Sequence, residues 1–147
     1  LMTSAERNGM RLISVVLGSP SIRGREDASA ALLNYGYTFF ETVKLHEGGH
    51  AVVTPQVYKG EAESVPLGTR STTFVTLARG AADSITKETT VNSPLVAPIK
   101  AGTALGQYTV RVGDEVVARL PLVALEDVEE GGLWRWAVDS IKLWFAD

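Results

Sequence analysis

The sequence predicts a mostly β chain, in which a small all-β sandwich follows the strand and helix of an α/β domain and precedes a C-terminal amphipathic helix. Three observations support this prediction. Residues 10–18 form an almost continuous apolar run, residues 41–127 hold short runs punctuated by glycine and proline, and residues 131–147 contain all three tryptophans. Short strands at this spacing, without helical patterns between them, are typical of a sandwich or barrel.

The composition is that of a soluble globular protein. The 147 residues are 45% hydrophobic and 21% charged, enough for one ordinary domain or two small ones. The net charge of −3 gives no overall electrostatic reason to bind nucleic acid, and the absence of cysteine excludes disulfides and thiolate metal sites. No apolar run approaches the roughly 18 residues that a membrane-spanning helix needs. Because the first residue is Leu1, we expect a chain that was processed, truncated or cut.

The first expected elements are a strand and a helix. The run Met10–Gly18 is rich in branched residues, which favours a strand covered on both faces inside a larger sheet. Residues 25–40 form a helix in which Glu26 and Asp27 lie in the first turn, where they complement the helix dipole. Its apolar stripe consists of Ala28, Ala31, Leu32, Tyr35 and Phe39. One strand and one helix do not make a domain, so we expect the sheet partners to lie outside these 147 residues.

The pattern then changes from helical to alternating. Residues 84–91 have an alternating pattern with Ile85, Thr89 and Val91 on one face, and residues 107–125 form two strands around the tight-turn pair Gly113-Asp114. Further strand-like runs cover residues 51–58, 72–78 and 95–99. Prolines within this zone indicate edge strands or bulges: Pro55, Pro66, Pro94, Pro98 and Pro121.

The C-terminal segment, residues 131–147, has the pattern of an amphipathic helix. Its apolar arc consists of Leu133, Trp134, Ala137, Val138, Ile141, Trp144 and Phe145. One interpretation is a helix packed on the protein's own core. The other is an interfacial helix on a membrane surface, where tryptophan is favoured. The position of the segment at the end of the chain, after Gly131-Gly132, favours the membrane interpretation.

The only two histidines lie in an H-E-x-x-H sequence, which is the motif of zinc proteases. It is formed by His46, Glu47 and His50. Two histidines four residues apart meet on one face only in an α-helix. Here the intervening residues are both glycine, each of which costs a helix roughly 1 kcal/mol relative to alanine. The segment also lies where the helical pattern ends, so we interpret it as a turn and predict no metal ligands.

A second motif, Ser84-Ile85-Thr86-Lys87, spells S-x-x-K, the nucleophile and base of penicillin-binding enzymes. That chemistry needs the serine and lysine one helical turn apart, so that the amine can take the hydroxyl proton. In an alternating strand, residues three apart point to opposite faces. We therefore interpret this match as accidental.

The order of the segments resembles a known family, the low-molecular-mass penicillin-binding proteins, and within it the serine D-alanyl-D-alanine carboxypeptidases of the penicillin-binding protein 5/6 type. The resemblance covers nearly the whole chain. It is carried, in order, by "NGMRLISVVLG", "GREDASAALLNYGYTFFETV", "RLPLVALEDV" and "IKLWF".

The resemblance implies three parts. Residues 1–40 would be the last strands and closing helix of a penicillin-recognising, β-lactamase-like catalytic domain. Residues 41–127 would form the all-β C-terminal domain, and residues 128–147 a membrane-anchor helix. The anchor contacts implied by this likeness are Leu133, Trp134, Val138, Ile141, Trp144 and Phe145.

The family's catalytic motifs, S-x-x-K, S-x-N and K-T-G, are implied to lie before Leu1, since the nearest spelling of the last is "KAG" at Lys100 in an expected turn. The resemblance carries over one active-site position, Arg25, as a ligand of the substrate's terminal carboxylate. A guanidinium suits that role because it can form two parallel hydrogen bonds. The alternative is an arginine at the helix start that pairs with Glu26 or with solvent.

The implied function is trimming of peptidoglycan stem peptides through an acyl-serine that β-lactams also acylate. This chain would supply the stalk and the tether to the periplasmic face of the inner membrane, without the nucleophile. No cofactor is implied, and the rest of the catalytic domain or another protein is a possible partner. The alternative function is a non-catalytic β-sandwich binding module.

Overall fold

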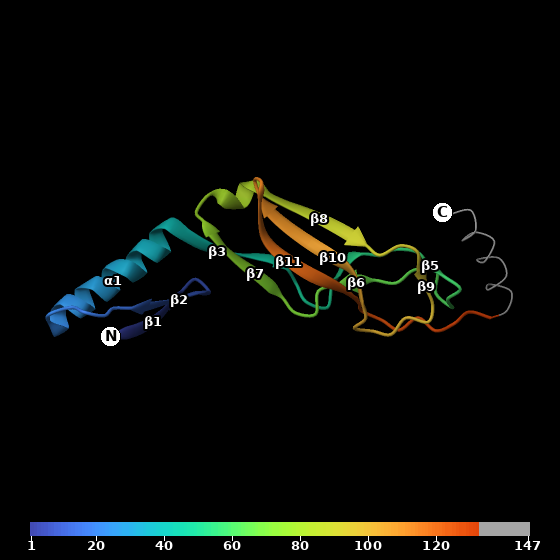
Figure 1. Cartoon of the computed structure of the whole chain (residues 1–147), viewed down its shortest axis with the longest axis horizontal. Helices are drawn as coiled ribbons and strands as arrows, with labels where there is room; N and C mark the ends of the chain where they lie inside the picture. Colours follow the sequence, from blue (N-terminus) through green and yellow to red (C-terminus); the bar gives the residue numbers. More distant parts are fainter. Residues whose placement is uncertain (133–147) are drawn as a thin grey trace. The chain divides into compact units, whose positions relative to one another are not determined.

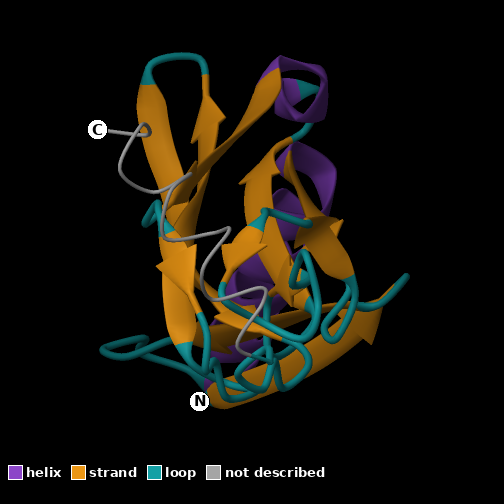
Figure 2. Cartoon of the chain, turned by 90° about the vertical axis from the view of Figure 1, so that its right-hand side faces the viewer, coloured by secondary structure: helices purple, strands orange, loops and turns teal. Residues whose placement is uncertain are grey.

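The structure, a computed structural model, describes residues 1–132. These residues form two compact units, one of residues 1–43 and 74–83 and the other of residues 44–73 and 84–132. Strands and loops make up most of the described chain, as Figure 2 shows, together with one long helix. The predicted mostly β class is therefore confirmed. The predicted C-terminal helix lies outside the described residues.

The first unit begins with a hairpin that the sequence did not predict. Strands β1 (Met2–Arg7) and β2 (Met10–Val15) pair antiparallel. The turn between them is Asn8-Gly9, and both residues have positive φ, as a tight hairpin turn requires. The expectation that every sheet partner of the apolar run lies outside the chain was therefore wrong.

The prediction that a larger sheet covers the run on both faces stays a prediction, because the described residues cover only one face of it. Met10 and Ser14 are buried on the face of β2 that packs on the helix, whereas Ile13 on the other face is 65% exposed. The strand ends at Val15, before the predicted end at Gly18.

Helix α1 (Ile22–Phe39) lies along the hairpin (Figure 1). It begins three residues earlier than predicted because the Ser21 side chain caps it, accepting a hydrogen bond from the Gly24 N–H at 3.0 Å. Glu26 and Asp27 therefore lie in the second turn, where the dipole effect of the helix start is weaker.

The face of α1 that packs on the hairpin contains small residues. Ser29 is buried and its hydroxyl contacts those of Ser14 and Thr3, and a side chain at Gly36 would overlap Leu12. The predicted apolar stripe faces the other way: Leu32, Tyr35 and Phe39 are each more than half exposed.

Strand β3 (Phe40–His46) follows α1 directly. It pairs with β7 (Thr73–Ala78), which comes later in the chain. In the first unit, Arg79 follows β7 and caps the C-terminal end of α1. Its guanidinium donates to the carbonyl oxygens of Tyr37, Thr38 and Phe40 at 2.9, 3.1 and 3.2 Å. The last carbonyls of a helix have no partner within it, and a cation there also complements the helix dipole. A short 3-10 helix, η1 (Ala81–Ser84), comes next.

The second unit is built on a twisted five-stranded antiparallel sheet in the order β4-β6-β11-β10-β8. Its strands are β4 (Ala51–Val53), β6 (Leu67–Gly68), β8 (Ile85–Val91), β10 (Ala104–Val112) and β11 (Glu115–Ala124). The hairpin predicted around Gly113-Asp114 is confirmed, since Val112 pairs with Glu115 across that turn.

The core of this unit contains the largest fully buried side chains among residues 1–132: Val65, Leu67, Val110 and Leu122. Pro121 lies within β11, although β11 is an inner strand of the sheet. The pairing of β11 with β6 involves Val123 and Ala124 of β11, so β11 behaves as an edge strand on that side at Pro121, where the missing N–H costs no ladder bond.

A parallel pair, β5 (Val57–Tyr58) and β9 (Leu95–Val96), completes the described strands. Near it, Asp127 accepts hydrogen bonds from the Ala101 N–H at 2.7 Å and from Lys100, and these hold the pKa of its carboxyl below the usual value. Lys100 also contacts Glu129, and the pKa of its ammonium is raised by its bonds to Glu129 and Asp127. The ion pairs are exposed, so they contribute little stability.

Candidate functional site

Arg25, the one predicted substrate ligand, lies in the first turn of α1. Its backbone N–H donates to the carbonyl of Ser21 at 3.2 Å, which fixes the residue at the capped end of the helix. With Leu1, Ile22 and Glu26 the side chain lines a small cavity of about 140 Å³. A guanidinium can bind a carboxylate through two parallel hydrogen bonds. Substrate binding by Arg25 stays a prediction, and the adjacent Glu26 keeps the alternative of a local pair open.

The H-E-x-x-H segment forms the end of a strand and a turn. His46 is the last residue of β3, Gly48-Gly49 forms the turn, and His50 precedes β4. Each imidazole contacts a backbone carbonyl: His46 Nε2 contacts the His50 carbonyl oxygen at 2.9 Å, and His50 Nδ1 contacts that of Gly48 at 3.2 Å. Within residues 1–132, no three acidic or histidine side chains are placed to hold a metal.

The S-x-x-K spelling is likewise split between two elements. Ser84 is the last residue of η1, whereas Lys87 lies in β8 and donates to the carbonyl oxygen of Leu45 at 3.0 Å. The two side chains therefore do not occupy one face of an α-helix, which is the arrangement that the nucleophile and base of penicillin-binding enzymes need. "KAG" at Lys100 leads into a turn in which Gly102 has positive φ.

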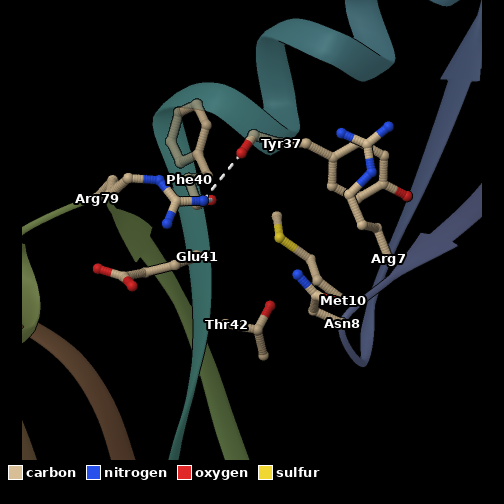
Figure 3. A pocket seen from close by; sticks show the side chains of 8 residues that line it. All are labelled: Arg7, Asn8, Met10, Tyr37, Phe40, Glu41, Thr42 and Arg79. Atoms are coloured by element: carbon tan, nitrogen blue, oxygen red, sulfur yellow. Dashed lines mark hydrogen bonds between the residues drawn. The ribbon is translucent and has the colours of Figure 1, made fainter.

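A second cavity, of about 220 Å³, opens in the first unit (Figure 3). It lies between the tip of the β1–β2 hairpin, the C-terminal end of α1 and the start of β3. The lining residues are Arg7, Asn8, Met10, Tyr37, Phe40, Glu41, Thr42 and Arg79. Sequence reasoning missed this group because its members come from three segments, the last more than seventy positions after the first, and no spacing rule links them.

The charged side chains that line this cavity differ in the partners they already have. Arg79 already donates to three carbonyls, and Glu41 accepts a hydrogen bond from the Gly80 N–H at 2.9 Å. Arg7 instead stacks on Tyr37, with its guanidinium carbon 4.6 Å from the ring centroid. Stacking of this kind leaves the in-plane N–H groups of a guanidinium able to bind an anion.

The predicted membrane contacts, Leu133, Trp134, Val138, Ile141, Trp144 and Phe145, all lie outside the described residues. Among the described residues, no helix has both the length and the apolar character to span a membrane.

Comparison with known proteins gives a consistent result. Residues 40–130 match the family described as penicillin-binding protein 5, C-terminal domain. The chain is 35% identical to D-alanyl-D-alanine carboxypeptidase DacC of Escherichia coli, over 99% of this chain and 38% of that protein. It is also 35% identical to D-alanyl-D-alanine carboxypeptidase DacA of Haemophilus influenzae, over 92% of this chain and 36% of that protein.

Solved structures show the same likeness. The crystal structure of penicillin binding protein 5 from Haemophilus influenzae has a TM-score of 0.82 and 34% identity to this chain. The match covers 88% of this chain and 38% of that structure. The chain thus spans less than two fifths of the length of the curated relatives described above.

Proposed function

Because the chain belongs to the penicillin-binding protein 5 family of D-alanyl-D-alanine carboxypeptidases, we propose that it is the C-terminal part of such an enzyme in the bacterial periplasm. The observation that carries the proposal is the match of residues 40–130 to the family's C-terminal domain, together with relatives that align with nearly the whole chain. In this proposal, residues 1–40 complete a catalytic domain, residues 41–127 form the stalk, and residues 128–147 form the anchor.

The complete enzyme would attack the terminal D-alanyl-D-alanine amide of a peptidoglycan stem peptide. A serine outside residues 1–147 would displace the terminal D-alanine and form an acyl-enzyme, which water would then hydrolyse. β-Lactams would acylate the same serine. The exposed apolar side chains on both faces of the first unit, such as Ile13 and Leu32, support the proposal, because a larger domain would cover them.

Within this scheme Arg25 would bind the terminal carboxylate of the stem peptide. Its position in the first turn of a capped helix supports this role, since the capped turn holds the arginine backbone in place. The side chain lines a cavity of about 140 Å³, which leaves room for a carboxylate group beside it.

Fluorescent penicillin should label the complete enzyme covalently and leave residues 1–147 alone unlabelled. The reason is that Ser84 and Lys87 lie on different elements and cannot act as nucleophile and base. Intact-mass analysis after incubation measures the adduct, and digestion locates the labelled serine. A stoichiometric adduct on the isolated chain would show that our assignment of the nucleophile to another segment is wrong.

The C-terminal segment should tether the protein to a lipid surface. An interfacial helix gains affinity from apolar side chains buried at the level of the headgroups, and residues 131–147 contain three tryptophans to supply them. Liposome flotation of the chain with and without residues 131–147 measures the effect, and we expect binding only with the segment. A variant with Trp134, Trp144 and Phe145 changed to serine keeps the length and charge as a matched control. Equal flotation of the intact and shortened chains contradicts the tether.

A further inference from the structure

The cavity at the hairpin tip has a cationic wall whose geometry is already fixed. Arg7 is the last residue of β1, and its guanidinium lies over the Tyr37 ring at 4.6 Å. The stacked arrangement orients the guanidinium plane, so that its N–H fork does not need to be ordered when an anion arrives. Arg7 is exposed, so the fork can be reached from solvent.

The neighbouring charges leave Arg7 as the group able to take a ligand. Arg79 is bound to three carbonyls at the end of α1. The carboxylate of Glu41 accepts the Gly80 N–H, and in Figure 3 it points away from Arg7. Among the described residues that line the cavity, Arg7 is therefore the cation available to an anion, and the acidic side chain of Glu41 is turned away from it.

The rest of the wall sets the size and polarity of a ligand. Met10 lies below Arg7 and Tyr37 in Figure 3, and Thr42 offers a hydroxyl beside it. The volume of about 220 Å³ is below the range of roughly 300–1,000 Å³ of sites for drug-sized molecules, so it suits a group as small as one residue.

We propose that this cavity binds a small carboxylate with a short apolar side chain, the chemistry shared by a free amino acid and by the C-terminal residue of a peptide. The carboxylate lies on the Arg7 fork, and the side chain contacts Met10. The choice of alanine as the residue rests on the proposed function, since that reaction consumes a terminal D-alanine and releases it. The proposed binding of a carboxylate by Arg7 does not depend on that reaction.

The test is an NMR titration of the isotope-labelled 147-residue chain with D-alanine, N-acetyl-D-alanine and N-acetyl-D-alaninamide. We expect saturable shifts of the Asn8 and Thr42 amides, with a Kd of about 1–10 mM for a ligand this small at an exposed guanidinium. The amide lacks the carboxylate and should bind at least tenfold more weakly. Preference for D-alanine identifies a free amino acid as the source, and preference for N-acetyl-D-alanine identifies a peptide terminus.

A matched pair of variants distinguishes binding of the carboxylate in the cavity from a general electrostatic attraction of anions to the basic hairpin. Arg7→Gln should weaken N-acetyl-D-alanine binding at least tenfold. Arg11→Gln removes the same charge from the same hairpin at a residue that pairs with Glu6 at 2.7 Å, and it should leave the affinity unchanged. Equal loss in both variants, equal affinity for the amide, or no saturable shift overturns the proposal. If Arg7→Gln does not fold, the comparison of carboxylate and amide ligands on the unaltered chain still decides. Penicillin labelling of the complete enzyme tests the proposed function independently of this cavity.

Discussion

Replacing Gly68 with alanine should lower the free energy of unfolding by about 3 kcal/mol. This value is at the upper end of the usual cost of adding atoms to a well-packed interior. Gly68 is in β6, where it pairs with Ala51 of β4 on one side and with Val123 of β11 on the other. A Cβ atom at this position would overlap the backbone carbonyl oxygen of His50. The obstacle is backbone, so rotation of a side chain cannot relieve the clash.

The neighbouring contacts make a shift of His50 costly. Its carbonyl oxygen contacts His46 Nε2 at 2.9 Å, and the N–H of Gly49 donates to the Thr69 carbonyl at 2.9 Å. Moving His50 away from β6 would therefore disturb the turn as well as the β4–β6 pairing. The H-E-x-x-H segment thus has a structural role, namely the close packing of a turn and strand against β6.

Urea unfolding followed by circular dichroism measures the change in unfolding free energy. Gly132→Ala is the matched control, because a Cβ atom there meets nothing within 4 Å, and its free energy of unfolding should stay within about 0.5 kcal/mol of the parent. If Gly68→Ala unfolds at the same urea concentration as Gly132→Ala, the close approach of the His50 carbonyl to Gly68 is contradicted.

The sequence was most informative where the governing interactions are local. The β10–β11 hairpin follows from a tight-turn pair between two alternating runs, and the turn at Gly48-Gly49 follows from the cost of glycine in a helix. Glu26 and Asp27 place the predicted start of α1 too late, because the Ser21 cap decides where the helix begins. Ser21 was visible in the sequence and could have corrected this prediction.

The errors that could not have been corrected concern contacts between distant segments. Strand β1 has the polar sequence MTSAER, and only its pairing with β2 makes it a strand. The cavity at Arg7 depends on a stacking contact with Tyr37, thirty positions later in the chain. An apolar stripe predicts that a helix face is buried, but it does not identify the partner, and the Leu32 face of α1 is exposed among the described residues.

In the complete enzyme, Arg25→Ala should lower kcat/KM for a peptide ending in D-alanyl-D-alanine by about 10- to 100-fold. Hydrogen bonds to charged groups are each worth about 1.5–3 kcal/mol, and the terminal carboxylate would lose its guanidinium partner. The measurement is the rate of D-alanine release over a range of substrate concentrations. Arg25→Lys keeps the charge without the planar fork, so it should recover part of the loss.

A comparison of substrates separates carboxylate recognition from a general effect on the helix. The unaltered enzyme should prefer a peptide with a free terminal carboxylate over the same peptide with a terminal amide, and Arg25→Ala should abolish that preference. Arg23→Ala, on the same turn of α1 but outside the cavity lined by Arg25, should keep both the activity and the preference. A merely structural role would lower kcat/KM for both peptides by the same factor. If Arg25→Ala retains the preference for the carboxylate, the arginine pairs locally with Glu26 or solvent, and another group binds the substrate terminus.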